Sequence, residues 1–166
     1  MHLFKLNPKA IEKISVAVRN PMDTNKGPMR ISIASNKEGS KLELINANEK
    51  VKVYTDGSAH SNKVGAAAIL TRPGRRHRIL HYHLGPASKH NNYEAELVAI
   101  LMGLRLIKTE KSGSTSFALG ADNHAAIKSF TLDLVHSGQD IATNIIRLAS
   151  KIREKRKSHK YSLVIF

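Results

Sequence analysis

The sequence predicts an α/β fold in which a mixed five-stranded sheet is flanked by helices. Two observations support this prediction. Three strand-like segments follow one another between residues 51 and 85, with only short turns between them. From residue 92 to the end of the 166-residue chain, helical and strand-like segments then alternate. Strands joined by tight turns pair antiparallel, whereas strands reached through helices pair parallel, so we expect both kinds of pairing in one sheet.

The three consecutive strands are predicted at 51–59, 64–72 and 77–85. The first, VKVYTDGSA, is typical of a buried strand, and we expect it to end in a turn at its Asp-Gly pair. Small and β-branched residues dominate the second strand, and a Pro-Gly turn follows it. The third strand alternates apolar and polar residues, which is typical of a strand with one solvated face.

The later elements begin with a helix at 93–108, where leucine and isoleucine recur at helical spacing. A strand is predicted at 114–122, and Asn123 should then cap a short helix. A basic helix follows Gly138, and the last strand is predicted at 161–166. The expected inward faces of the two last helices are Ile127, Phe130 and Leu134 in one, and Ile141, Ile145, Leu148 and Ile152 in the other.

Residues 1–50 differ from the rest of the chain, because they contain no long amphipathic segment. The segments 29–35 and 41–47 each alternate apolar and polar residues, so we expect a hairpin there. An isolated hairpin is only marginally stable in water. We therefore expect residues 1–50 to be a loosely attached arm or connector, and residues 51–166 to be the folded domain.

The net charge points to the partner. The chain has 27 Lys and Arg against 13 Asp and Glu, or +14 at pH 7, which favours nucleic acid. Aromatic residues make up only 5%, which argues against a single-strand binder that stacks bases on rings. The absence of cysteine excludes disulfides and thiolate metal sites. Without a long apolar segment or a signal peptide, we expect no membrane partner and an intracellular location, cytoplasmic or nuclear.

Three of the few acidic residues in 51–166 fall at matching ends of predicted elements. Asp56 and Asp122 end the first and fourth strands, and Glu96 lies in the first turn of the first helix. If these strands are parallel neighbours, the helix can bring all three carboxylates together at one sheet edge, where they suit Mg²⁺ or Mn²⁺. Each has an ordinary explanation, as a turn residue, a helix-dipole partner or a residue beside a cap. Their combination favours a site.

The segments YTDGSAHSNKVGAAAIL, NNYEAELVAILMGLRLI and ALGADNHAAIKS resemble the ribonuclease H domain, especially the version carried by retroelement reverse transcriptases. The resemblance covers residues 51–166. It implies a ribonuclease H-like fold and cleavage of the RNA strand of RNA–DNA hybrids with two divalent ions, Mg²⁺ or Mn²⁺. By the same resemblance, Asp56 would bridge the ions, while Glu96 and Asp122 would each complete one metal shell.

The resemblance also implies contacts with the substrate. Asn62 and Asn92 match positions that contact the minor groove, and His124 takes a place often held by glutamine. Such contacts, with those to 2′-hydroxyl groups, can distinguish RNA from DNA. Each asparagine is alternatively a loop or cap residue.

The chain departs from the family at its end. The family has a fourth carboxylate, and usually a histidine, beyond the fifth strand, whereas this sequence ends at Phe166. We therefore expect a C-terminally truncated domain with one metal site incomplete. The alternative function is a catalytically impaired, nucleic-acid-binding remnant of a retroelement reverse transcriptase. A phosphate-binding α/β domain of other chemistry would leave Glu96 and Asp122 unexplained.

A basic segment follows at 147–160, with seven Lys and Arg and one Glu. It is either a solvated helix face or a contact with the phosphate backbone of a nucleic acid.

Overall fold

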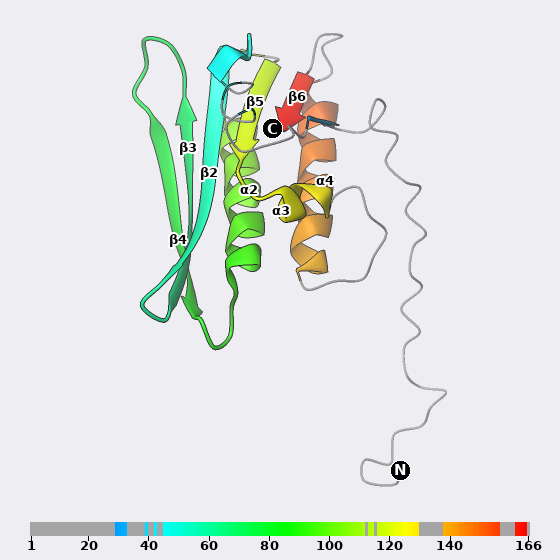
Figure 1. The fold of residues 1–166 in the computed structure, drawn as a ribbon. Coiled ribbons are helices and arrows are strands. Elements are labelled where there is room, and N and C mark those ends of the chain that lie inside the picture. The colour runs from blue at the N-terminus through cyan, green and yellow to red at the C-terminus, as the bar shows by residue number, and fades with distance from the viewer. Residues whose placement is uncertain are drawn as a thin grey trace, which may run out of the picture.

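A computed structural model describes the chain at residues 29–32, 39, 42, 45–111, 113–114, 116–129, 138–156 and 162–165. Within these residues it forms one six-stranded sheet in the order β1-β6-β5-β2-β3-β4, with helices packed against it (Figure 1). The antiparallel strands stand at one side of the sheet and the parallel strands at the other. The predicted fold class is therefore confirmed, with one additional strand.

The antiparallel half consists of β2 (Val51–His60), β3 (Lys63–Thr71) and β4 (Arg78–Pro86). The expected turn at the Asp-Gly pair is wrong, because β2 continues past it and pairs with β3 as far as the His60–Lys63 pair. The turn lies instead at Ser61 and Asn62, which both have positive φ angles, 47° and 60°. Asparagine tolerates this backbone conformation better than most residues, which favours the turn at that position.

The parallel half consists of β5 (Ser116–Ala121), β6 (Ser162–Ile165) and β1 (Arg30–Ile31). β2 pairs in parallel with β5 from Val51 to Thr55, and β5 pairs in parallel with β6. The parallel pairing of β2 stops one residue before its aspartate, which fixes the sheet edge at which the acidic side chains lie.

Three helices are described in full: α2 (Asn92–Lys108), α3 (His124–Lys128) and α4 (Gln139–Lys155). α2 packs on β2, β3 and β5, and α4 packs on α2. The apolar residues predicted to face inward from α4 all belong to the hydrophobic core or pack against it. Of the residues predicted for the preceding helix, Phe130 and Leu134 lie outside the described part of the chain.

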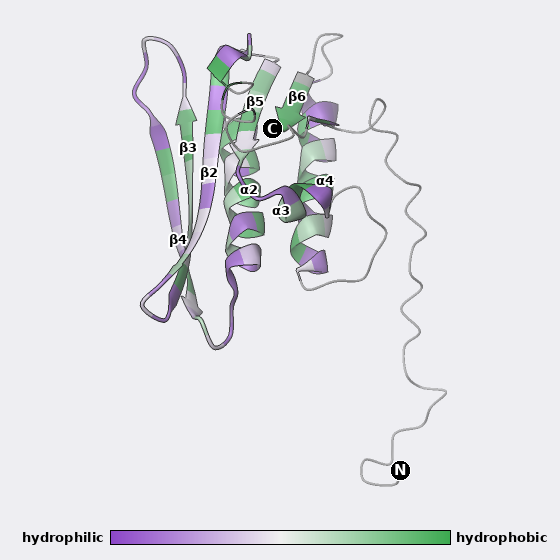
Figure 2. Cartoon of the chain, viewed as in Figure 1, coloured by the Kyte–Doolittle hydropathy of each residue, from purple (hydrophilic) through white to green (hydrophobic). Residues whose placement is uncertain are grey.

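Hydrophobic residues fill the layer between the sheet and the helices. Figure 2 shows them along β5 and β6 and on α2 and α4, whereas the start of α2 and the segment entering α3 are hydrophilic. Gly103 lets α2 approach the sheet closely, since a Cβ at this position would lie 2.9 Å from the Cγ2 atom of Thr55. Among the described residues, no helix is long and apolar enough to cross a membrane.

The hairpin expected between 29–35 and 41–47 is wrong. Arg30–Ile31 pairs with β6 instead, and Ser32 donates a backbone hydrogen bond to the Ile165 carbonyl at 2.8 Å. In the second segment, the described residues Leu42, Ile45 and Asn46 are helical. The alternation of apolar and polar residues in short segments misled the prediction. Whether two residues form a strand depends on the strand they pair with, and here that partner is remote in sequence. The domain boundary at residue 50 stays a prediction.

Candidate metal centre

Three carboxylates converge at the edge of the sheet. One oxygen atom from each of Asp56, Glu96 and Asp122 lies within 4.8 Å of the others. The two aspartates are exposed to solvent, whereas Glu96 is only 3% exposed. The grouping expected from the sequence is thus present, although Asp56 lies inside β2 rather than at its end.

The pairing of β2 with β5 places the two aspartates. Thr55 and Ala121 are register partners, so Asp56 and Asp122 are the next residues on two adjacent parallel strands. The Thr55 side chain strengthens this junction, because its Oγ1 donates a buried hydrogen bond to the Gly120 carbonyl at 3.0 Å. A buried hydroxyl with a partner resists local separation of the strands.

Close packing of α2 against β2 brings the third carboxylate into the group. A Cβ on Gly57 would lie 2.4 Å from the Glu96 nitrogen and 2.6 Å from the Ala95 carbonyl carbon. Both are backbone atoms, which cannot move aside as a flexible side chain can. Gly57 is therefore required for the helix to cross the strand beside Asp56.

A capping box fixes the start of α2. The Glu94 N–H donates to Asn91 Oδ1 at 2.8 Å, and the Asn91 N–H donates to Glu94 Oε2 at 3.3 Å. His90 Nδ1 lies 3.2 Å from the same Glu94 oxygen. The two capping bonds satisfy backbone N–H groups that the start of the helix would leave unpaired, and so they hold Glu96 in position one turn later.

The carboxylates open into a pocket of about 580 Å³, whose wall includes Asn92 and His124 as well as the three acids. Asn123 caps α3 as predicted, because its Oδ1 accepts a hydrogen bond from the Ala126 N–H at 3.0 Å. This cap turns the chain directly after Asp122 and places His124 at the pocket.

Asn62 lies apart from this pocket. It occupies the β2–β3 turn, where its carbonyl accepts a hydrogen bond from the Ala87 N–H at 3.0 Å. The structure therefore brings together five of the six predicted site residues. Asn62 is the exception, because it lies in the turn at the tip of the β2–β3 hairpin, outside the pocket lining.

The donor set suits a hard divalent cation. Three carboxylates so close together repel one another, and one of them is buried, where an uncompensated charge is costly. A divalent cation relieves both penalties, and Mg²⁺ and Mn²⁺ prefer such oxygen ligands. The residues present thus fit the metal that the sequence predicts.

Gly57 is the residue that the sequence analysis missed. Its signal was available, since a glycine inside a strand often marks a place where another backbone approaches closely. The Asp-Gly pair was interpreted as a turn instead, because that is the more frequent role of this dipeptide.

Comparison with solved structures finds the same architecture in ribonuclease H1 proteins. LC11-RNase H1, isolated from compost and solved in complex with an RNA/DNA hybrid, is 17% identical over 70% of this chain and 83% of its own, with a TM-score of 0.52. The N-terminal RNase H domain of a Mycobacterium tuberculosis protein, fused to maltose binding protein, is 18% identical over 69% of this chain and 83% of its own, with a TM-score of 0.51.

These likenesses show that the chain has a ribonuclease H-like fold. By sequence, no protein-family model and no curated protein matches the chain.

Proposed function

We propose that this chain is a divalent-metal-dependent nuclease that cleaves the RNA strand of RNA–DNA hybrids. The observation that carries the proposal is the convergence of Asp56, Glu96 and Asp122 within 4.8 Å. The ribonuclease H-like fold supports the substrate class, since a structural relative of the chain was solved with an RNA/DNA hybrid.

In this proposal Asp56, Glu96 and Asp122 would hold Mg²⁺ or Mn²⁺, with one of the family's two metal sites incomplete because no fourth carboxylate joins the cluster among the described residues. The chemistry that such ions supply is to ionise an attacking water and to stabilise the leaving oxygen of a phosphodiester. The protein's own contribution is positional: β2 and β5 fix the aspartates, and the close contact of Gly57 with α2 fixes Glu96.

The residues around the acids would orient the substrate. Asn92 and His124 line the same pocket as the carboxylates, at the first positions of α2 and α3. An amide and an imidazole can hydrogen-bond to sugar hydroxyl and base-edge groups in a hybrid minor groove. The Asn62 turn would contact the duplex further from the scissile bond.

Cleavage of a labelled RNA–DNA hybrid tests the proposal. The wild-type chain should cut the RNA strand with Mg²⁺ or Mn²⁺, and Asp56→Asn and Asp122→Asn should each lower the rate by at least about 100-fold. Asp140→Asn is the matched control, because Asp140 is an exposed acid in the first turn of α4, outside the cluster. Equal cleavage by all three variants would contradict the assignment of the site.

The second candidate function is binding without cleavage, as in a catalytically impaired remnant of a retroelement reverse transcriptase. The net charge of +14 favours it, because affinity for a phosphate backbone needs no assembled metal site. Hybrid binding by a wild-type chain that never cuts would support it. The retroelement origin and the intracellular location remain proposals of the same kind.

A further inference from the structure

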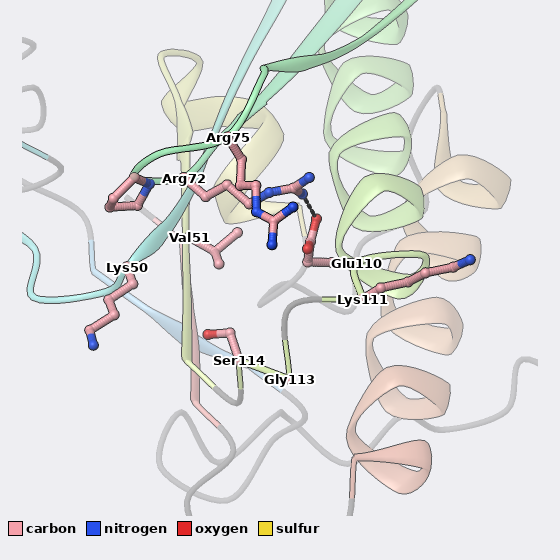
Figure 3. Close-up of a pocket in the computed structure, with 9 residues that line it drawn as sticks. Lys50, Val51, Arg72, Arg75, Glu110, Lys111, Gly113 and Ser114 are labelled. Atoms are coloured by element: carbon pink, nitrogen blue, oxygen red, sulfur yellow. Dashed lines mark hydrogen bonds and ion pairs between the residues drawn. The ribbon is translucent and has the colours of Figure 1, made fainter.

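A second pocket lies at the other end of α2 from the carboxylates (Figure 3). It holds about 560 Å³ between the start of β2, the segment after β3 and the segment after α2. α2 has 17 residues and rises about 1.5 Å per residue, so roughly 25 Å separates its two ends. This second pocket is therefore distinct from the candidate metal centre.

Cations dominate its lining. Lys50, Arg72, Arg75 and Lys111 contribute four positive charges, and Glu110 is the single acid among the lining residues. Positive charge of this density is repulsive unless an anion offsets it.

The negative charge of Glu110 is already offset by two arginines. Glu110 has a side chain that is only 2% exposed, and it forms ion pairs with both Arg72 and Arg78. A buried carboxylate held between two guanidiniums has its charge offset within the protein. Glu110 therefore does not neutralise the remaining cations of the pocket.

The C-terminal end of α2, which carries the negative end of the helix dipole, is also paired with a positive charge. Arg156 donates hydrogen bonds to the carbonyls of Ile107, Glu110 and Ser114, at 3.0, 2.8 and 2.7 Å. Its guanidinium also lies over the Phe117 ring, 4.8 Å from the centroid. The bond to Ile107 satisfies a carbonyl in the last turn of α2, which would otherwise repel an anion near the helix C-terminus.

Three exposed cations remain without such a role. Figure 3 shows the Arg75 guanidinium beside that of Arg72, and Lys50 and Lys111 extending to opposite sides of the pocket. Among the described residues, the side chains of Arg75, Lys50 and Lys111 make no hydrogen bond or ion pair.

We propose that this pocket binds a phosphate group, with Arg75 as its principal ligand and the two lysines at its margins. A guanidinium presents paired donors that match phosphate oxygens, and lysine stems are long enough to swing toward a bound anion. The phosphate would come either from a nucleic-acid backbone or from a free phosphorylated molecule. The proposal does not depend on cleavage at the metal centre.

Binding of two probes to the full chain in EDTA tests the proposal. Pyrophosphate is titrated by calorimetry, and a fluorescein-labelled RNA–DNA hybrid by anisotropy. Arg75→Gln should weaken binding by about ten-fold, the effect of losing one charge-assisted hydrogen bond. Arg76→Gln is the matched control, because it removes the same charge from the same loop at a residue outside the pocket lining.

The two probes separate the two sources. Arg75-dependent binding of pyrophosphate supports a site for a free phosphorylated molecule, and Arg75-dependent binding confined to the hybrid supports a site for backbone phosphates. Equal weakening by Arg75→Gln and Arg76→Gln, or no binding of either probe, would overturn the proposal. Unchanged thermal stability of both variants is expected, since both arginines are exposed and the Glu110 ion pairs are retained.

Discussion

Glu96 is the buried member of three carboxylates whose oxygens lie within 4.8 Å of one another. Its position is set by a glycine on the facing strand, because no side chain fits between Gly57 and the backbone of α2. At the scale of single residues, the site therefore depends on a glycine at position 57 as much as on the three acidic residues. The three carboxylates also repel one another, and a bound cation would remove this repulsion.

The repulsion predicts that divalent ions stabilise the folded chain. Mg²⁺ or Mn²⁺ at concentrations well above Kd should raise the melting temperature, because a ligand that binds only the native state stabilises it. Asp122→Asn should abolish most of this shift while leaving the fold intact, since Asp122 is exposed. The measurement is thermal unfolding with and without the metal, and an equal shift in the variant would argue against this site.

Gly57→Ala should damage both stability and activity. The added Cβ would force α2 away from β2, which is expected to destabilise the fold by about 1–3 kcal/mol. A displacement of about 1 Å at Glu96 is expected to lower cleavage by roughly 100-fold. Denaturant unfolding and hybrid cleavage measure the two effects.

Gly65→Ala is the matched control for this change. Gly65 lies on the adjacent strand β3, where a new Cβ would meet only the Tyr82 carbonyl oxygen at an ordinary 3.5 Å. Activity lost equally in both variants would show that the effect is not specific to the contact with α2.

At the scale of secondary-structure elements, α2 joins the candidate metal centre at its N-terminal end to the basic pocket at its C-terminal end. Its N-terminal end carries the capping box and, one turn later, Glu96, and near its C-terminal end the Ile107 carbonyl accepts a hydrogen bond from Arg156, the residue that follows α4. Arg156 thereby ties two helices to the start of β5 through the Ser114 carbonyl.

Arg156→Met should lower the free energy of unfolding by about 2–3 kcal/mol, because several carbonyls lose a charged donor at once. Methionine keeps an apolar stem of similar length, so the loss reports what the guanidinium supplies, namely its hydrogen bonds and its contact with the Phe117 ring. Lys151→Met, on the exposed face of the same helix, should change stability by less than about 0.5 kcal/mol. Similar losses in both variants would refute this role.

Local patterns predicted the elements that are long or carry strong signals. The periodic leucines of α2 and the cap at Asn123 were confirmed, since helical spacing and capping act within a few residues. The segment 29–35 that contains β1 was predicted to pair with 41–47, and this partner was wrong, because β1 pairs with β6, which is remote in sequence. The convergence of the three acids was predicted on the condition that the first and fourth strands are parallel neighbours, as β2 and β5 are.

What the sequence could not supply was contact between remote backbones. An Asp-Gly pair can form a turn or can lie in a strand beneath a crossing helix, and the dipeptide itself does not tell the two apart. Here the packing of α2 on Gly57 decides between them. The basic pocket likewise combines residues from three distant segments, whose side chains follow no pattern along the chain.

At the scale of the whole molecule, the sheet extends beyond the predicted domain. Met29 is only 3% exposed and belongs to the hydrophobic core, and Arg30–Ile31 completes the edge beside β6. The net charge of +14 also acts at this scale, because it makes binding to any polyanion sensitive to salt.

Removal of residues 1–32 should therefore destabilise the fold by about 2–4 kcal/mol, mostly through the loss of a buried methionine. Removal of residues 1–27 is the control, because it keeps Met29 and β1. Chemical unfolding of the two shortened chains gives the difference, and equal stability would mean that β1 contributes nothing to the domain.

The hydrogen bond between Thr55 and Gly120 joins residues 65 positions apart in the chain. The β2–β3–β4 meander needs only local turns, whose closure is fast compared with pairing across a long crossover. During synthesis the meander is complete before Asp122 has been translated. We therefore expect the antiparallel strands to form early and the carboxylates to meet late, so that a growing polypeptide assembles the three-acid cluster only after β5 and Asp122 have emerged.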